Sequence, residues 1–420
     1  MSQNKGKVHY AWLMLICLCL MVGLGRGGLN NSGGLYLTPV SEDLGIGIGS
    51  LSVYMSIASI ATMVFLPIAG KILTKYDVRL VLVGAVILQA GSFSMFGFMN
   101  SVWGWYIFAV PMSIGAIFIT QVSGPVLLNQ WFKKRTGFAI GVMMAASGAI
   151  GAIIQPIIGS LIENQGWRFA YTSIGVVVIA ISVPIIIFFI RKPQDKNMLP
   201  YGQAEVTQDD NQETKEPEVS GVELAVARKS MALYALILFF FLITSFGSFA
   251  MHIPSYAMSM GHDVKFAGNV MSAFMIGMLV GSLTFGYLSD KIGAKSTALF
   301  AMVVGFTSVS LLLFLAEMNI MLMLGVGLFG FVSASIGTLG PVLTSTLFGN
   351  RDYTQIFSTA SLGLAVAGIL ALPIYGYIYQ FTGTYSSALY AILVMLVIAT
   401  FIIFVAFKGK QKLIDEGKWV

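Results

Sequence analysis

Apolar segments long enough to cross a lipid bilayer recur along almost the whole chain. One spanning helix needs about 20 apolar residues, and the sequence offers twelve such segments. We expect them at residues 10–38, 50–73, 80–98, 104–128, 137–161, 168–190, 231–258, 267–288, 297–315, 320–347, 355–380 and 386–407. Because only 10% of the residues are charged, the chain cannot cover itself with a water-facing surface. The sequence therefore predicts an all-α membrane protein with twelve transmembrane helices.

One long polar segment divides these helices into two sets of six. Residues 191–230 carry many charges and lack apolar periodicity, apart from a short helix expected near VELAVA at 222–227. We therefore expect a six-helix bundle over residues 1–190, a cytoplasmic linker over 191–230 and a second six-helix bundle over 231–420.

The basic residues predict how the chain lies in the membrane. With the N-terminus in the cytoplasm, the cytoplasmic loops, linker and tails hold 21 of the 24 Lys and Arg residues, and the opposite loops hold only Arg168 and Lys265. Lys and Arg concentrate on the cytoplasmic side of membrane proteins. We expect a monomeric, multi-pass protein of the plasma membrane, embedded in the lipid bilayer with both termini in the cytoplasm. Since this topology explains the net charge of +6, nucleic-acid binding is not indicated.

Arg26 is the remaining basic residue, and it falls inside the first apolar segment. Every Asp and Glu can be placed in a loop, in a tail or at a helix end, so no acidic partner is expected near it. Asn30 follows one turn later on the same helix face. A guanidinium can bind a carboxylate through two parallel hydrogen bonds; alternatively, carbonyls of a broken helix could hold Arg26. Because intramembrane charges mark functional sites, we predict that Arg26 binds an anion.

The two halves of the chain share sequence at a constant offset. The segment GKILTKYDVR begins at Gly70 and GYLSDKIGAK at Gly286, while GPVLLNQWF begins at Gly124 and GPVLTSTLF at Gly340. Both pairs are 216 residues apart. This predicts a duplicated unit with pseudo-symmetric halves, the arrangement in which a transporter's halves move about a central site.

Twelve helices, a central linker and the segment GYLSDKIGAK together resemble the major facilitator superfamily. In that family this segment favours one conformational state, and the matching residues here are Gly286, Asp290, Lys291 and Gly293. The first-half copy keeps Gly70 and Arg79, with Thr74 in place of the expected acid and Asp77 in place of the second glycine. The resemblance implies the major facilitator fold and a conformational switch at these residues.

Two stretches of the first half, residues 33–57 and 129–171, resemble the monocarboxylate porter and oxalate–formate antiporter group. This resemblance implies a small carboxylate as substrate. The second half departs from the group's pattern, because Ser282 occupies the position of its helix 8 cation and Ser358 to Ser361 carries none of its helix 11 charge.

Polar residues on the helices that line the central cavity in this superfamily are further candidates for substrate binding. Gln121 lies on the predicted helix 104–128, and His252 and Tyr256 share one face of the predicted helix 231–258. Asn30 and Gln121 could instead join neighbouring helices by hydrogen bonds. His252 could carry a proton, bind substrate or lie at the membrane interface.

We therefore predict a secondary transporter of a small organic anion, a monocarboxylate, that works by alternating access. Coupling could use a counter-anion, His252, or a proton carried with the substrate. An exporter of amphipathic drugs or lipids and a transporter-like ligand sensor are the alternatives. The sequence shows no metal-ligand cluster, nucleophile–base pair or phosphate-binding loop, so we expect neither an enzyme nor a cofactor or metal site.

Overall fold

The computed structural model describes residues 9–196, 198–203 and 220–419, and nearly all of them lie in helices. Within these residues, ten helices are long and apolar enough to cross a membrane. They are Tyr10–Leu44, Ile48–Leu73, Val78–Phe98, Val102–Trp131, Thr136–Phe189, Met231–Ser259, Val264–Phe314, Asn319–Phe348, Tyr353–Thr382 and Ser386–Asp415. The all-α membrane class predicted from the sequence is confirmed.

Two of these helices, α8 (Thr136–Phe189) and α13 (Val264–Phe314), are far longer than one crossing requires. They contain 54 and 51 residues, or roughly 80 Å of helix against a hydrocarbon core of about 30 Å. Each is interrupted by a non-helical glycine, Gly166 with φ 83° and Gly293 with φ 81°. These positive φ values favour glycine because a Cβ atom would be strained there. Each long helix therefore consists of two consecutive segments joined at its glycine.

Most of the other crossings are built from several short segments. The first comprises α1 (Tyr10–Val22), the π-helix η1 (Gly23–Leu29), the 3₁₀-helix η2 (Asn30–Ser32) and α2 (Gly33–Leu44). The second crossing is the single helix α3 (Ile48–Lys75). The third comprises α4 (Val78–Val86), the π-helix η3 (Ile87–Gly91), α5 (Ser92–Met95) and η4 (Phe96–Phe98). The fourth comprises α6 (Val102–Ala116), the π-helix η5 (Ile117–Val122) and α7 (Ser123–Trp131).

Most crossings after residue 189 are also built from several short segments. A short η6 (Gln194–Lys196) and α10 (Leu224–Ala227) lie in the predicted linker, and α10 confirms the helix expected near VELAVA. The later crossings comprise α11 (Met231–Ser248), η7 (Phe249–His252) and α12 (Ile253–Ser259); α14 (Asn319–Ser333) and α15 (Ser335–Phe348); α16 (Tyr353–Ala360) and α17 (Leu362–Thr382); and α18 (Ser386–Asp415).

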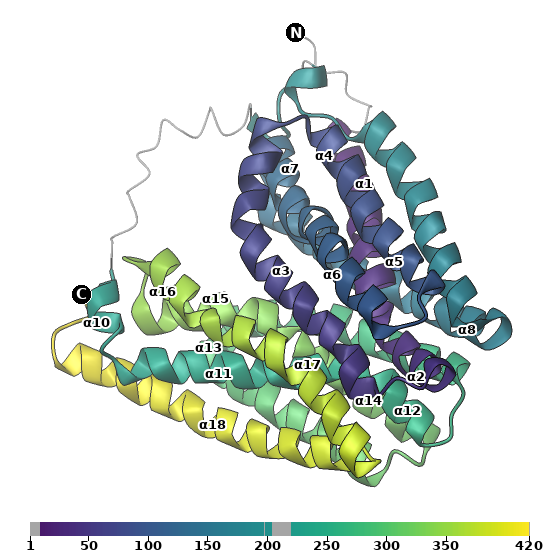
Figure 1. Cartoon of the computed structure of the whole chain (residues 1–420). Helices are drawn as coiled ribbons and strands as arrows, with labels where there is room; N and C mark the ends of the chain where they lie inside the picture. Colours follow the sequence, from purple (N-terminus) through teal and green to yellow (C-terminus); the bar gives the residue numbers. More distant parts are fainter. Residues whose placement is uncertain (1–8, 197, 204–219, 420) are drawn as a thin grey trace.

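The helices form two groups that meet at one end and separate at the other (Figure 1). The first group runs from α1 to α8 and the second from α11 to α18. Where they meet, α2 lies beside α12 and α3 beside α17; we call this the joined end. At the opposite end, α7 and α16 lie far apart in Figure 1. We call this the linker end, because residues 191–203 and 220–230 lie there.

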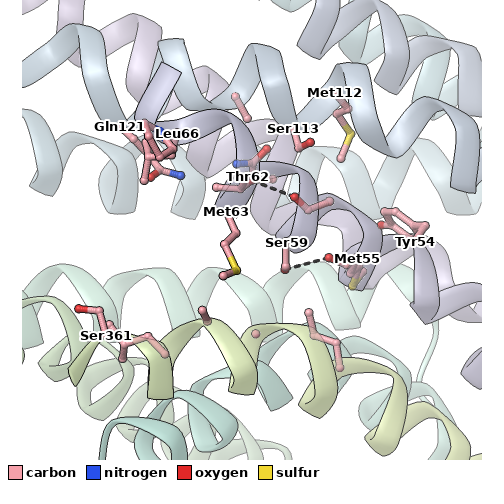
Figure 2. A pocket seen from close by; sticks show the side chains of 18 of the residues that line it. Tyr54, Met55, Ser59, Thr62, Met63, Leu66, Met112, Ser113, Gln121 and Ser361 are labelled. Atoms are coloured by element: carbon pink, nitrogen blue, oxygen red, sulfur yellow. Dashed lines mark hydrogen bonds between the residues drawn. The ribbon is translucent and has the colours of Figure 1, made fainter. Parts of the chain in front are cut away.

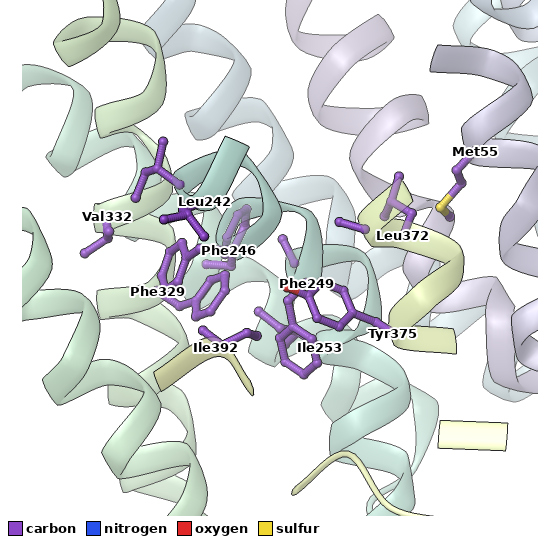
Figure 3. Packing of buried hydrophobic residues seen from close by; sticks show 14 of the residues in the cluster. Met55, Leu242, Phe246, Phe249, Ile253, Phe329, Val332, Leu372, Tyr375 and Ile392 are labelled. Atoms are coloured by element: carbon purple, nitrogen blue, oxygen red, sulfur yellow. The ribbon is translucent and has the colours of Figure 1, made fainter. Parts of the chain in front are cut away.

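The apolar core has the same division. One cluster of buried residues is confined to the first group, from Ala11 to Ile190. The other extends over the second group and continues into the first, including Leu35 and Tyr171. Figure 3 shows part of this cluster around Phe246 and Phe329, whose rings stack at 4.0 Å. The two groups therefore share a core at the joined end and not at the linker end.

Close backbone approaches hold the joined end together. The hydroxyl of Thr38 donates to the Ser255 hydroxyl at 2.8 Å, and the Ser272 hydroxyl donates to the Ala152 carbonyl at 2.6 Å. A Cβ atom on Gly268 would lie 2.8 Å from the Gln155 carbonyl oxygen, so a larger residue would separate α13 from α8.

A disulfide cross-link tests this arrangement. In a background with Cys17→Ser and Cys19→Ser, the pair Thr38→Cys and Ser255→Cys should oxidise readily, because the two native hydroxyl oxygens lie 2.8 Å apart. Mass spectrometry of the peptides detects the bond.

The control pair is Gly141→Cys with Gly286→Cys, where an added Cβ atom would meet nothing within 4 Å at either position. This pair should stay reduced under the same conditions. Equal cross-linking of both pairs would contradict an arrangement joined at one end only.

Candidate functional site

A cavity of about 730 Å³ opens between the two groups of helices. Its walls come mainly from α3, α6 and η5 on one side and from α16 and α17 on the other (Figure 2). The polar side chains that line it are Asn30, Tyr54, Ser59, Thr62, Ser113, Gln121, Ser358 and Ser361. The remaining wall is apolar and includes Met55, Met63, Leu66, Met112 and Met251. Both halves of the chain therefore contribute to one cavity, as expected for a central binding site.

Arg26 lies in η1, one turn before the cavity residue Asn30. Its side chain is exposed, and its Nη1 atom lies 3.7 Å from the sulfur of Met144, a weak acceptor. Within the part of the chain that the structure describes, no Asp or Glu forms an ion pair with it. The structure thus presents a membrane-embedded cation that lacks an acidic partner among these residues.

Two glutamine side chains hold the backbone on either side of Arg26. Gln89 in η3 donates from Nε2 to the Gly25 carbonyl at 2.9 Å, and also to Asn30 Oδ1 at 3.0 Å. Gln155 in α8 donates from Nε2 to the Gly27 carbonyl at 3.0 Å. Neither glutamine was among the candidates from the sequence. Each is an isolated amide in an apolar segment, the same signal that pointed to Gln121.

Two π-helical segments of the first group, η3 and η5, both lie against the third, η1. They carry Arg26, Gln89 and Gln121. Gln121 lines the cavity, while its neighbour Thr120 turns inward and donates to the Ala116 carbonyl at 2.8 Å. π-Helical turns are rare and are frequently found at functional sites. The arrangement therefore concentrates irregular backbone and polar side chains at one level of the bundle.

His252 and Tyr256 do not lie with this group. His252 is fully buried, with Nε2 2.9 Å from the Leu372 carbonyl and Nδ1 3.3 Å from the Tyr385 hydroxyl. The carbonyl can only accept, so Nε2 carries the proton. Tyr256 is also buried and donates to the Leu312 carbonyl. The sequence predicted one face along an unbroken helix over 231–258, but the 3₁₀ turn of η7 interrupts this helix. Because a 3₁₀ turn has about three residues per turn, it redirects both side chains.

The predicted switch residues of the second half lie in α13 at and just before its break, and Gly70 lies in the last turns of α3. Gly293 forms the break in α13, and an added Cβ atom on Gly70 or Gly286 would meet nothing within 4 Å. Asp290 is exposed and has no ion pair among the described residues, while the ammonium of Lys291 lies 5.5 Å from the ring centre of Tyr287.

In the first-half copy, Asp77 caps α4. Its carboxylate accepts from the Arg79 backbone N–H at 2.8 Å and pairs with the Arg79 guanidinium at 3.3 Å. The hydrogen bond from the Arg79 backbone N–H is the main cause that lowers the pKa of Asp77 below its ordinary value of 3.8. The residue that replaces the expected glycine thus stabilises the start of the next helix.

No group of three His, Cys, Asp or Glu residues converges anywhere in residues 9–196, 198–203 and 220–419, so these ranges contain no cluster that could hold a metal ion. The cavity lining provides amide groups and hydroxyl groups, while Arg26 is not among the lining residues and lies one helical turn before Asn30. Such a set can bind and release a ligand without changing it chemically.

Comparison with known proteins agrees with this geometry. The sequence profile described as the Major Facilitator Superfamily matches residues 11–269 and 259–417. Monocarboxylate transporter 12 of Xenopus laevis is 22% identical over 414 residues, covering 92% of this chain and 88% of that protein. The oxalate:formate antiporter of Oxalobacter formigenes is 24% identical over 391 residues, covering 89% and 85%.

Solved structures show the same fold. A bacterial homologue of the human lysosomal transporter Spinster, in an inward-facing and unoccupied conformation, has a TM-score of 0.72 at 15% identity, covering 97% of this chain and 99% of that one. The nucleoside transporter NupG has a TM-score of 0.73 at 14% identity, covering 96% and 100%.

The burial of His252 leads to a prediction about stability. His252→Ala should lower the free energy of unfolding by about 2–4 kcal/mol, because it leaves a cavity and removes the partner of the Leu372 carbonyl. Ligand affinity should not change, since the side chain does not reach the cavity. Thermal unfolding and ligand titration of the purified protein measure the two effects separately. A large loss of affinity at unchanged stability would place His252 in the binding site instead.

The cap at Asp77 predicts a pH-dependent effect. Asp77→Ala should cost about 1 kcal/mol near neutral pH, as for other helix N-caps. Because folding lowers the pKa of Asp77, this stabilisation is present above the unfolded pKa and is lost as the pH falls through the folded value. Thermal unfolding of both proteins from pH 7 downward should show the difference shrinking below about pH 4. A constant difference throughout would contradict the cap.

Proposed function

Because the chain belongs to the major facilitator superfamily, and is therefore a membrane transport protein, we propose that it is a secondary active transporter of a small organic anion. It moves a monocarboxylate across the plasma membrane by alternating access between its two halves. The open linker end and the closed joined end correspond to one of the two access states.

The unpaired guanidinium of Arg26 is the observation that carries this proposal. A cation inside a membrane protein is costly unless a counter-charge or water accompanies it. Since no described acidic residue pairs with Arg26, a bound anion is the natural partner. One cation suits one carboxylate better than two, and this favours a monocarboxylate over a dicarboxylate.

Asn30 and Gln121 complete the binding group from the same half of the chain. Both line the cavity and can form hydrogen bonds with carboxylate oxygens or with a substrate hydroxyl. His252 and Tyr256, which we expected to take part, are assigned to the packing of the second half. The names of two relatives, a monocarboxylate transporter and an oxalate:formate antiporter, also support a carboxylate substrate.

We further propose twelve crossings, in two groups of six. The ten long helices become twelve when α8 and α13 are each divided at Gly166 and Gly293. The linker end then faces the cytoplasm, as the distribution of Lys and Arg predicts. Asp290 and Lys291, which are both exposed in this structure, act when the linker end closes.

The apolar wall of the cavity favours a second candidate, the export of amphipathic molecules. Four of its side chains, Met55, Met63, Met112 and Met251, are flexible and adapt to varied apolar surfaces. Transport of such molecules would not need Arg26. Variants of Arg26 therefore separate the two functions.

Thermal-shift binding and liposome uptake of small carboxylates test the proposal. Arg26→Ala should weaken carboxylate binding by about 100-fold, and Arg26→Lys should bind with intermediate affinity, because an ammonium keeps the charge without the paired geometry. The matched control is Arg228→Ala, at an exposed arginine of the linker, which should behave like the wild type. Carboxylate binding that is unchanged in Arg26→Ala would refute the anion site. Binding of amphipathic cations by wild type and Arg26→Ala alike would favour the exporter.

A further inference from the structure

We propose that Gln89 and Gln155 are positioning residues that fix Arg26 and Asn30 as a receptor made entirely of hydrogen-bond donors. The inference rests on the proposed anion site and explains how the protein holds that site open without an acidic residue. Both glutamines are buried, with at most 1% of their surface exposed, so they act on the substrate only through the backbone and Asn30.

The backbone around Arg26 is where these two residues act. Over Gly23–Leu29 the chain leaves the α-helical pattern, and then passes through a 3₁₀ turn before α2 begins. Gln89 bonds the carbonyl before Arg26 and Gln155 bonds the carbonyl after it, from opposite sides of the helix. The absence of side chains at Gly25 and Gly27 permits this approach, since a Cβ atom on Gly27 would lie 2.3 Å from the Ser147 carbonyl oxygen. The position of Arg26 is therefore fixed from neighbouring helices.

Gln89 also sets the orientation of Asn30. The Gly25 carbonyl can only accept a hydrogen bond, so the atom of Gln89 that faces it must be the nitrogen Nε2. The same nitrogen lies 3.0 Å from Asn30, whose facing atom must then be the acceptor Oδ1. This leaves the two N–H groups of Asn30 for the cavity. Asn30 and the guanidinium of Arg26, one helical turn away, then both present donors, which suits a carboxylate.

Gln155 connects this site with the joint between the two halves. Its side chain bonds Gly27, while its backbone carbonyl lies against Gly268 of α13. A shift of α13 against α8 therefore acts on the residue that holds the Arg26 segment. Its Oε1 atom is buried and has no hydrogen-bond partner among the described residues.

The second half of the chain serves as an internal comparison. At the offset of 216 residues, the counterparts of Arg26, Asn30, Gln89 and Gln155 are Leu242, Phe246, Gly305 and Ala371. Leu242 and Phe246 belong to the apolar core and lie in the regular helix α11 (Figure 3). All four polar residues, and the π-helical turn that carries Arg26, are thus particular to the first half. A purely structural requirement of the repeat would apply equally to both halves.

The test uses the variants Gln89→Met and Gln155→Met, which keep the side-chain length and remove the donor. Each should raise the dissociation constant for the carboxylate found with the wild type by about tenfold, and raise KM in liposome uptake with kcat within twofold. The matched control is Gln165→Met, an exposed glutamine of the same helix α8, which should leave both constants unchanged.

A second pair covers the case in which a methionine variant does not fold. Gln89→Glu and Gln155→Glu keep the shape but place an acceptor against each carbonyl and a negative charge beside Arg26, and carboxylate binding should be lost.

The outcomes separate this inference from the proposed function. If the wild type binds no carboxylate, the proposed function fails and the positioning role fails with it. If the wild type binds and Arg26→Ala does not, but folded variants of Gln89 and Gln155 bind like the wild type, only the positioning role is wrong. A tenfold fall of kcat in the Gln89 and Gln155 variants, with KM unchanged, would also overturn the positioning role. That result would indicate a defect in conformational change instead of binding.

Discussion

A helix that leaves the α-helical pattern inside a bilayer must find hydrogen-bond partners within the protein, because lipid offers none. In this chain that constraint is met at the first crossing. The side-chain amides of Gln89 and Gln155 reach the carbonyls beside Arg26, and glycines allow the neighbouring helices to approach. The irregular backbone, the amide partners and the cation therefore depend on one another. Substituting any one of them alters the surroundings of the other two.

The two halves share an architecture but differ in backbone regularity and in the residues at equivalent positions. The first half has irregular π-helical crossings and most of the polar residues of the cavity, to which the second half adds Ser358 and Ser361. The second half has the core residues Leu242, Phe246 and Ala371 at equivalent positions, and its His252 contacts Leu372 and Tyr385. On the proposed function, the first half thus supplies most of the polar contacts to the ligand, while the second half is more uniformly packed with apolar residues.

Much of the fold was predictable from the sequence because lipid imposes simple rules. The apolar segments and the small helix at 224–227 follow from the pattern of apolar and polar residues along the chain. The two long helices differ from expectation only because the break at Gly166 and at Gly293 is a single residue. Arg26 was predictable for the same reason, since a lone charge in an apolar segment is conspicuous.

The rest of the site depends on helix phase, which composition does not reveal. A regular helix over 231–258 would align His252 and Tyr256 on one face. The 3₁₀ turn of η7 changes the rotation of these residues about the helix axis, and both side chains lie in the core. Gln89 and Gln155 carry the same signal as Gln121, a single amide among apolar residues. Only the packing of the helices distinguishes an amide that faces the cavity from one that holds another helix.

The missing partner of Arg26 also bears on the energetics of the transport cycle. While the linker end is open, water can solvate the exposed guanidinium. A carrier that closed without ligand would remove that water and leave the charge without a counter-ion, at a cost of several kcal/mol. A carrier that closes around an anion avoids this cost. On the proposed function, the empty protein should therefore reorient far more slowly than the loaded one. That difference in rate favours exchange of one anion for another over net uptake. It also limits the leakage of small ions through the empty protein.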